Sequence, residues 1–189
     1  IAMLLTEQGL GGRSPDLRDR LHRFDEERGQ RASTARRTAD WIAKSTGAAN
    51  VSVDAARAGA VLARAFSDRV AKQRGGGFVM VNGRAAALDR SEALAREPFL
   101  VIADVAGAAG QSRILLGAPI SLEEIETMFD ARIETHASIA TDAVTGAVRG
   151  RRVRRLGRVV LSEAPLERLS GALRLDARVP PFMCVVSQT

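Results

Sequence analysis

The chain has few of the side chains that form cross-links or bind metals. Its 189 residues include one cysteine, Cys184, two histidines, His22 and His136, and no tyrosine. A single cysteine excludes a disulfide within the chain, and it cannot complete a structural zinc site with only two histidines. We therefore expect a fold held by an ordinary hydrophobic core, with no metal.

Long apolar runs and signal patterns are absent as well. No apolar run approaches the roughly 18 residues of a membrane-spanning helix, and no basic-then-apolar signal opens the chain. We therefore expect a soluble, cytoplasmic protein that does not contact a membrane. Because the chain starts at Ile1 without an initiator methionine, we interpret it as a piece of a longer protein.

The sequence also lacks the motifs of common enzymes. Both lysines, Lys44 and Lys72, follow alanine and not the glycine of a phosphate-binding loop. No G-x-S-x-G elbow occurs, and neither histidine has a partner at a catalytic spacing. We predict no catalytic residue, and no enzymatic activity for this chain alone.

The chain has enough hydrophobic residues to form a core, and it has an excess of positive charge. Hydrophobic residues make up 46% of the chain, enough for one large or two small domains, of which we prefer two. Lysine and arginine together number 28 against 22 acidic residues, a net charge of +6. This excess favours an anionic partner.

Two hydrophobic periods divide the chain. The apolar residues of 1–74 have helical spacing and predict three helices. The first is capped by Ser14 and has Leu17, Leu21 and Phe24 on its apolar face. The second runs from Ser33 or Thr34 to Thr46, and the third is capped by Asp54 and has an apolar stripe that reaches Val70. The three glycines at 75–77 predict a flexible joint. After this joint the pattern changes to that of strands.

Short strands and one helix are expected in the second part. Asn82-Gly83 between two apolar runs predicts a hairpin, and Ser121 is suited to cap a helix. Strands are expected at 99–105, 113–116 and 133–139, followed by a strand that carries the arginines. The prediction is an α+β fold with a helical segment over 1–74, an OB-like β-barrel with one interposed helix over 75–166, and a tail, 167–189, of undefined structure.

Six arginines lie between residues 149 and 158, in a run that ends in strand-forming residues. On a strand these arginines project from both faces, so neither face there can be core. Guanidinium groups bind phosphate bidentately and stack on bases, which predicts a nucleic-acid site. The candidates are Arg149, Arg151, Arg152, Arg154, Arg155 and Arg158, with Arg84 at the hairpin tip as a further residue. The alternative is a solvated edge strand in an arginine-rich protein.

Five segments resemble, in order and in spacing, the helicase-associated region of bacterial HrpB-type ATP-dependent helicases of the DEAH/RHA superfamily. They are LARAFSDRVAKQR at 62–74, GFVMVNGRAA at 77–86, LVIADV at 100–105, RI and API within 113–120, and RRLG with LSEAPL within 154–166. Ser67 stands where the family usually has proline, and Ala85 where it usually has glycine. The tail from residue 174 matches no expected family segment.

The resemblance implies a division of labour. In such helicases two RecA-like domains hydrolyse ATP, while a winged helix, a ratchet-like helical bundle and an OB-like barrel surround single-stranded nucleic acid. This chain resembles the end of that bundle plus the barrel, so ATP and Mg are expected only at motor domains outside it. The implied partners are single-stranded nucleic acid, RNA in preference to DNA, and the motor domains. The alternative is an interaction module that docks the motor or a partner protein.

Overall fold

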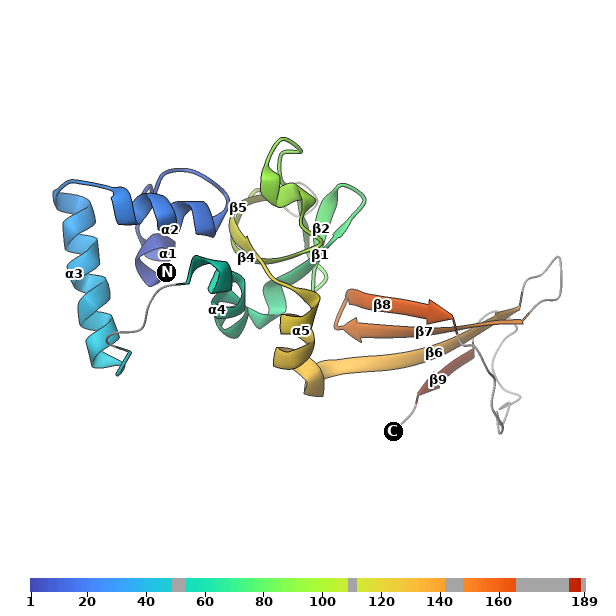
Figure 1. The fold of residues 1–189 in the computed structure, drawn as a ribbon. Helices are drawn as coiled ribbons and strands as arrows, with labels where there is room; N and C mark the ends of the chain where they lie inside the picture. The colour runs from blue at the N-terminus through green and yellow to red at the C-terminus, as the bar shows by residue number, and fades with distance from the viewer. Residues whose placement is uncertain (49–53, 109–111, 142–147, 166–183, 188–189) are drawn as a thin grey trace.

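A computed structural model shows an α+β protein in which helices precede two antiparallel sheets (Figure 1). The structure describes residues 1–48, 54–108, 112–141, 148–165 and 184–187. Within these ranges no helix has both the length and the apolar character needed to cross a membrane. The predicted fold class, helices followed by strands with one helix between strands, is confirmed at this level.

The N-terminal helices are α1 (Ala2–Thr6), α2 (Leu17–Glu26) and α3 (Gln30–Ser45). The apolar face predicted for α2 is confirmed, because Leu17, Leu21 and Phe24 are all buried. Its predicted cap is wrong: the Asp16 side chain accepts the Arg18 N–H, whereas the Ser14 hydroxyl donates to the Asp19 carboxylate. An aspartate next to the first turn caps the helix more directly than a serine two residues earlier.

The third predicted helix is much shorter than expected. Asp54 caps a 3-10 turn, η1 (Ala55–Arg57), which leads into α4 (Ala58–Ala65) and a second turn, η2 (Ser67–Arg69). The chain then enters β1 (Val70–Arg74), where Val70 pairs with Val101 and Ala71 with Leu100. A helix through Val70 is therefore wrong, because strand pairing with a distant segment outweighs the local spacing of apolar residues.

The first sheet has the order β3-β2-β1-β4-β5 and contains β2 (Gly77–Met80), β3 (Ala85–Ala86), β4 (Phe99–Ala106) and β5 (Arg113–Pro119), with a 3-10 turn, η3 (Ala93–Arg96), between β3 and β4. Gly75 and Gly76 form the tight turn of the β1–β2 hairpin, with φ of +61° and +85°. Glycine adopts this left-handed backbone without strain. The three glycines therefore join two strands of one sheet, and the boundary predicted at residue 74 falls within this hairpin.

The two edge strands of the first sheet meet at one residue. Ala87, just after β3, forms a parallel bridge with Arg113 of β5. The Ala87 N–H donates to the Ser112 carbonyl, and the Ile114 N–H donates to the Ala87 carbonyl, each at 2.9 Å. No closed barrel is assigned among the described residues, so the predicted OB-like barrel is not confirmed.

The chain continues through α5 (Leu122–Phe129) and a short turn, η4 (Asp130–Arg132), into a second sheet. Ser121 caps α5 as predicted and forms a capping box with Glu124. The second sheet, of order β8-β7-β6-β9, contains β6 (Ile133–Thr141), β7 (Val148–Leu156), β8 (Val159–Pro165) and β9 (Cys184–Ser187). The arginine strand is β7. The strands predicted over residues 75–166 therefore divide between two sheets, because β6, β7 and β8 pair with one another in succession.

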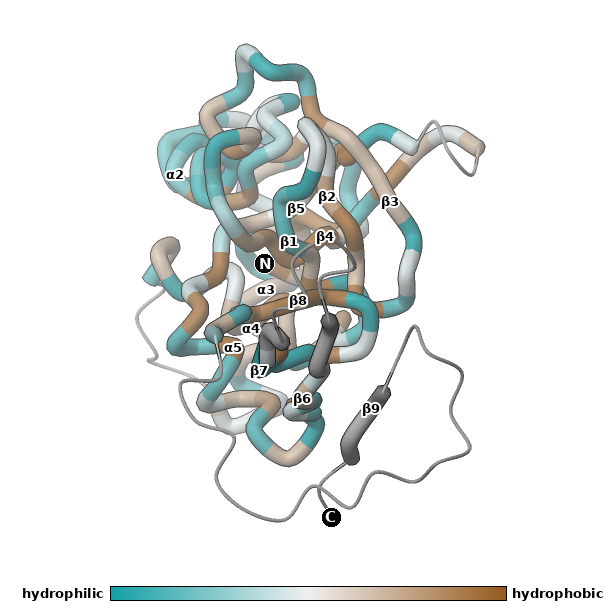
Figure 2. Tube along the Cα trace, turned by 90° about the vertical axis from the view of Figure 1, so that its right-hand side faces the viewer, coloured by the Kyte–Doolittle hydropathy of each residue, from teal (hydrophilic) through white to brown (hydrophobic). Residues whose placement is uncertain are grey.

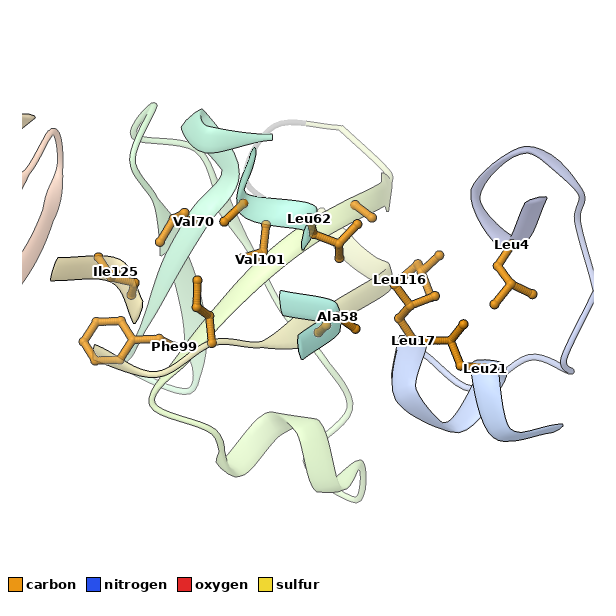
Figure 3. Packing of buried hydrophobic residues seen from close by; sticks show 14 of the residues in the cluster. Leu4, Leu17, Leu21, Ala58, Leu62, Val70, Phe99, Val101, Leu116 and Ile125 are labelled. Atoms are coloured by element: carbon orange, nitrogen blue, oxygen red, sulfur yellow. The ribbon is translucent and has the colours of Figure 1, made fainter. Parts of the chain in front are cut away.

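The hydrophobic core divides along the faces of the first sheet. On one face, side chains of β4 and β5 pack against α2, α4 and α5 (Figure 3). Leu100 and Ile102 of β4 point to the other face, where they join Phe78 and Met80. The strand predicted at 99–105 is confirmed, and it is buried from Phe99 to Ala103, whereas Asp104 is exposed. Apolar residues also concentrate along β2 and β4 in Figure 2.

The second sheet joins this core only at its base. Leu156, Val159 and Leu161 belong to the same cluster as Val70 and Phe99. Beyond this base, the sheet projects away from the first sheet (Figure 1). The strand with the arginines is thus anchored at one end.

Candidate nucleic-acid interface

The arginines of β7 alternate between the two faces of the second sheet. Arg151 and Arg155 share one face with the buried Val153, while Arg152 and Arg154 share the other with the buried Leu156. Arg151, Arg152 and Arg155 are exposed and Arg154 is half-buried. The side chain of Arg149 lies outside the described part of the structure. The prediction that arginines project from both faces is confirmed for the four described side chains.

Two of these arginines already have carboxylate partners. Arg151 approaches Glu163 of β8 at 3.7 Å, and Arg154 forms an ion pair with Glu126 of α5. Both partners of the Arg154 pair are half-buried, so its guanidinium is better ordered than a free surface arginine. Within the described ranges Arg152, Arg155 and Arg158 form no ion pair. These three are the cations most available to a ligand.

Arg158 and Arg84, which lie far apart in the sequence, occupy adjoining turns. The Arg158 N–H of the β7–β8 turn donates to the Val81 carbonyl at 3.1 Å. A Cβ built on Gly83, at the tip of the β2–β3 hairpin, would lie 3.3 Å from Cγ of Arg158. The hairpin tip therefore packs on the arginine turn, and Arg84 follows directly after the contact.

Lys72 connects the two sheets, which the sequence did not indicate. Its Nζ, on β1, donates to the carbonyls of Val160 at 2.7 Å and Leu161 at 3.4 Å, and lies 5.5 Å from the centre of the Phe99 ring. Lys72 therefore lies on a strand between the two sheets and not on the third predicted helix. The one feature of the sequence that could have drawn attention to Lys72 is that it is one of only two lysines in an arginine-rich chain.

The described side chains were also compared with the requirements of metal binding and of acid-base catalysis. In the ranges that the structure covers, no three His, Cys, Asp or Glu residues lie close enough together to hold a metal ion. His136 lies 3.0 Å from Glu134 two residues earlier on β6, a pair of neighbours on one strand face. Among the described residues, the feature of this region that bears on binding is the positive charge of the arginines.

Comparisons with known proteins support the resemblance found in the sequence. No protein-family model matches the chain. It is 28% identical over 114 residues to the ATP-dependent RNA helicase HrpB of Escherichia coli K12, an alignment that covers 58% of this chain and 14% of that protein. The chain thus spans about a seventh of the length of this relative.

Two solved structures of HrpB from E. coli are also similar. The first, described as a DExH-box NTPase, superposes with a TM-score of 0.69 at 25% identity and covers 89% of this chain and 20% of that one. The second, described as a DEAH/RHA helicase, gives a TM-score of 0.67 at 23% identity, with the same coverage. The resemblance to the HrpB-type DEAH/RHA helicases is confirmed.

Proposed function

We propose that this chain, which resembles a segment of the HrpB-type helicases in sequence and in fold, is a non-motor, nucleic-acid-gripping part of an ATP-dependent helicase. The relative in E. coli is described as an ATP-dependent RNA helicase, and the chain covers only a fraction of it. The sequence has no phosphate-binding loop, so ATP and Mg bind to motor domains and not here. The motor domains of the full-length protein are one partner.

We also propose that the first sheet is an OB-like barrel. Its strand order, β3-β2-β1-β4-β5, together with the parallel bridge between Ala87 and Arg113, has the pattern of five strands closing on themselves. Barrels of this class are five-stranded, partly open and bind oligonucleotides. The helix that we expected within the barrel, α5, then follows it and leads to the arginine strand.

The observation that carries the proposal is the set of arginines on the second sheet that form no ion pair within the described residues, Arg152, Arg155 and Arg158. All three are exposed. Arg152 and Arg155 lie on opposite faces of the sheet, and Arg158 lies in the β7–β8 turn against Gly83, the residue before Arg84. Phosphate contacts from such groups give binding that is tolerant of sequence and sensitive to salt. With no tyrosine and one tryptophan in the chain, stacking on aromatic residues contributes little. Single-stranded RNA is the preferred ligand, and a cytoplasmic location stays a prediction.

One observation favours the alternative, a protein interaction module. Arg151 and Arg154 bind carboxylates within the chain, so this surface can also pair with acidic protein groups. Ligand competition separates the two functions: poly-glutamate displaces an acidic partner, whereas oligo-U and oligo-dT displace each other from a phosphate-binding surface.

The test is a triple variant with a charge-matched control. R152Q/R155Q/R158Q should bind oligo-U more weakly than the unmodified chain, and each lost contact should flatten the slope of log K against log salt by about 0.7. The control, R37Q/R57Q/R64Q, removes the same amount of positive charge at exposed helical positions. If both variants bind alike, net charge alone explains the binding and the arginine strand is not the site.

A further inference from the structure

The outward side of α3 carries the one tryptophan of the chain. Trp41 is 68% exposed, although tryptophan is highly buried on average in folded proteins. Ala32, nine residues earlier and therefore on the opposite side of the helix, is buried in the core. In Figure 1, α3 forms the outer edge of the molecule, with α1 and α2 on its inner side. Trp41 therefore presents a large apolar ring on the outer surface of the helical segment.

A groove of about 450 Å³ lies between α1 and α3. Met3 of α1 and Ala35 of α3 supply part of its apolar lining, and Thr34 and Thr38 of α3 line it as well. Thr34, Thr38 and Trp41 are spaced at i, i+4 and i+7, so they follow one side of the helix. The groove and the exposed ring thus share this side of α3. We call these five residues the Trp41 surface.

Two of the four cations of α3 are engaged within the helical segment. Arg31 forms an ion pair with Glu7 of α1 at 3.4 Å. The Arg36 guanidinium lies 5.0 Å from the centre of the Phe24 ring and donates to the Glu27 carbonyl at 2.6 Å, at the C-terminal end of α2. These two arginines therefore contribute to the packing of α3 on its neighbours.

The other two cations of α3, Arg37 and Lys44, flank Trp41. Arg37 precedes Trp41 by four residues and Lys44 follows it by three, so both share its side of the helix. Both are exposed, and neither forms an ion pair with any described residue. Asp40, the one acidic residue of α3, is turned from Trp41 by about 100° around the helix. A partner must therefore offer apolar groups to the Trp41 surface and negative charge to the two cations.

An acidic amphipathic helix meets both requirements. Its apolar side chains at i, i+3, i+4 and i+7 can enter a groove between two helices, while carboxylates at the neighbouring positions meet the cations. The 16 residues of α3 span about 24 Å, which gives a partner helix about four turns of contact. Phosphate groups fit less well, because the Glu7 carboxylate also lines the groove. Tryptophan and arginine, moreover, are enriched at the hot spots of protein interfaces.

We propose that the Trp41 surface binds an acidic amphipathic helix of a partner protein. The apolar face of that helix packs on Trp41 and enters the groove between α1 and α3, and its carboxylates pair with Arg37 and Lys44. The Trp41 surface belongs to the helical segment, whereas the arginine strand belongs to the second sheet (Figure 1). This docking is therefore independent of the proposed binding of nucleic acid.

Trp41 provides the measurement, because it is the only tryptophan of the chain. The full chain is titrated with a designed helical peptide that has a leucine stripe at i, i+3, i+4 and i+7 and glutamate at most other positions. Binding should shift the Trp41 emission to shorter wavelength and protect the ring from acrylamide quenching. Neither effect should appear with a peptide that has lysine in place of glutamate, or with an acidic peptide of the same composition that lacks the stripe.

Variants of the tryptophan are measured with the acidic peptide carrying a fluorescent label. Trp41→Ala should weaken binding by about thirtyfold, as expected for a hot-spot residue, and Trp41→Phe should weaken it less. Val61→Ala is the matched control, because Val61 is also an exposed apolar residue but lies on α4. It should leave the affinity unchanged. An unchanged affinity of Trp41→Ala would overturn the proposal.

A pair of isosteric variants separates charge from shape. Thr34→Asp and Thr34→Asn place side chains of the same size at an exposed position of the groove. The aspartate repels the carboxylates of the peptide, so Thr34→Asp should bind it about three- to fivefold more weakly than Thr34→Asn. Equal binding by the two variants, with both folded by circular dichroism, would also overturn the proposal.

Other occupants of the Trp41 surface give different results. If oligo-dT shifts the Trp41 emission and the acidic peptide does not, the surface binds nucleic acid and the inference is wrong. An emission shift that depends on protein concentration alone would assign the surface to a second copy of the chain. If the full-length protein does not bind the peptide that this chain binds, another part of that protein covers Trp41. Each of these two results also overturns the proposal.

The arginine strand provides the last control, since an acidic peptide can also bind to its cations. R152Q/R155Q/R158Q should keep the full shift of the Trp41 emission with the acidic peptide, whatever it does to the binding of oligo-U. Loss of the shift in this variant would place the peptide on the second sheet and would contradict docking on α3.

Discussion

The two sheets of this protein use strands of similar length in opposite ways. In the first, β4 is buried from Phe99 to Ala103, so both of its faces belong to the core. In the second, only Val153 and Leu156 of the described β7 side chains are buried, and arginines take the positions around them. The first sheet therefore provides stability and leaves the second free to carry charge. Buried arginines would instead have required partners or a large desolvation cost.

The largest effect is expected for a substitution that disturbs the packing of α4 on the first sheet. A Cβ on Gly59 would lie 1.9 Å from the Pro119 carbonyl oxygen of β5, so Gly59→Ala must push the helix off the sheet. We expect it to lower the free energy of unfolding by about 3 kcal/mol, although alanine favours helix by about 1 kcal/mol. Urea unfolding measures the change.

Gly47→Asn is the control for that variant. Gly47 has a positive φ of +72° and nothing within 4 Å of a built Cβ, and asparagine tolerates this backbone. We expect a change below about 1 kcal/mol. If Gly59→Ala cost no more than this control, the helix and the sheet would not be in the close contact described.

A matched pair of valines compares the sheets directly. Val101 of β4 is 0% exposed and Val153 of β7 is 9% exposed. Val101→Ala should cost about 3 kcal/mol of unfolding free energy, since the surrounding core cannot collapse around the cavity. Val153→Ala should cost about 1 kcal/mol, because the sheet around it is mostly exposed. Equal costs in urea unfolding would show that the second sheet is as tightly packed as the first.

The connection between the sheets depends on Lys72, and the other lysine of the chain supplies the control. Lys72→Met removes the hydrogen bonds to the Val160 and Leu161 carbonyls and should cost about 1 to 2 kcal/mol. Amide exchange should rise in β8 more than in β4. Lys44→Met, at an exposed position in the last turn of α3, should change stability by less than about 0.5 kcal/mol. Uniform exchange in both strands would argue against a local connection.

Local signals in the sequence were enough to predict several elements. Asn82-Gly83 specifies a tight turn, Ser121 and Glu124 specify a helix start, and the apolar run at 99–103 is typical of a strand buried on both faces. Each of these signals acts through neighbours in the sequence. The strand state of β7 was also predicted from its own residues, without knowledge of its partners.

The predictions that were wrong or missing concern features set by distant partners. The apolar spacing from Leu62 to Val70 fits a helix, but Val70 is paired with Val101, and no local signal reports that pairing. The division of the strands between two sheets has no local signal either. At the candidate site, the sequence identified the arginines but not the ion pair of Arg154 with Glu126 or the contact between Gly83 and Arg158. Both join segments from different elements.

The smallest expected effect concerns the charge of Asp89, which follows β3 of the first sheet. The hydrogen bonds from the Ser91 backbone and hydroxyl, and then the charge of Arg113, lower the pKa of Asp89 below its ordinary 3.8. Ser91→Ala removes the hydroxyl but keeps the backbone N–H, so the pKa should rise part of the way toward 3.8. Carbon-detected NMR titration of the carboxylate measures this, with Ser33→Ala on α3 as the control that leaves Asp89 unchanged.

The sign of the linked pH dependence follows from the direction of that shift. Because the folded pKa lies below the unfolded one, the contribution of Asp89 to stability is present above the unfolded pKa and is lost as the pH falls through the folded pKa. Near neutral pH the carboxylate is therefore ionised in both the original chain and Ser91→Ala. Oligonucleotide binding at pH 7 should then be the same for the two proteins. A difference would mean that Ser91 itself contacts the ligand, which would place a binding residue on the first sheet as well as on the second.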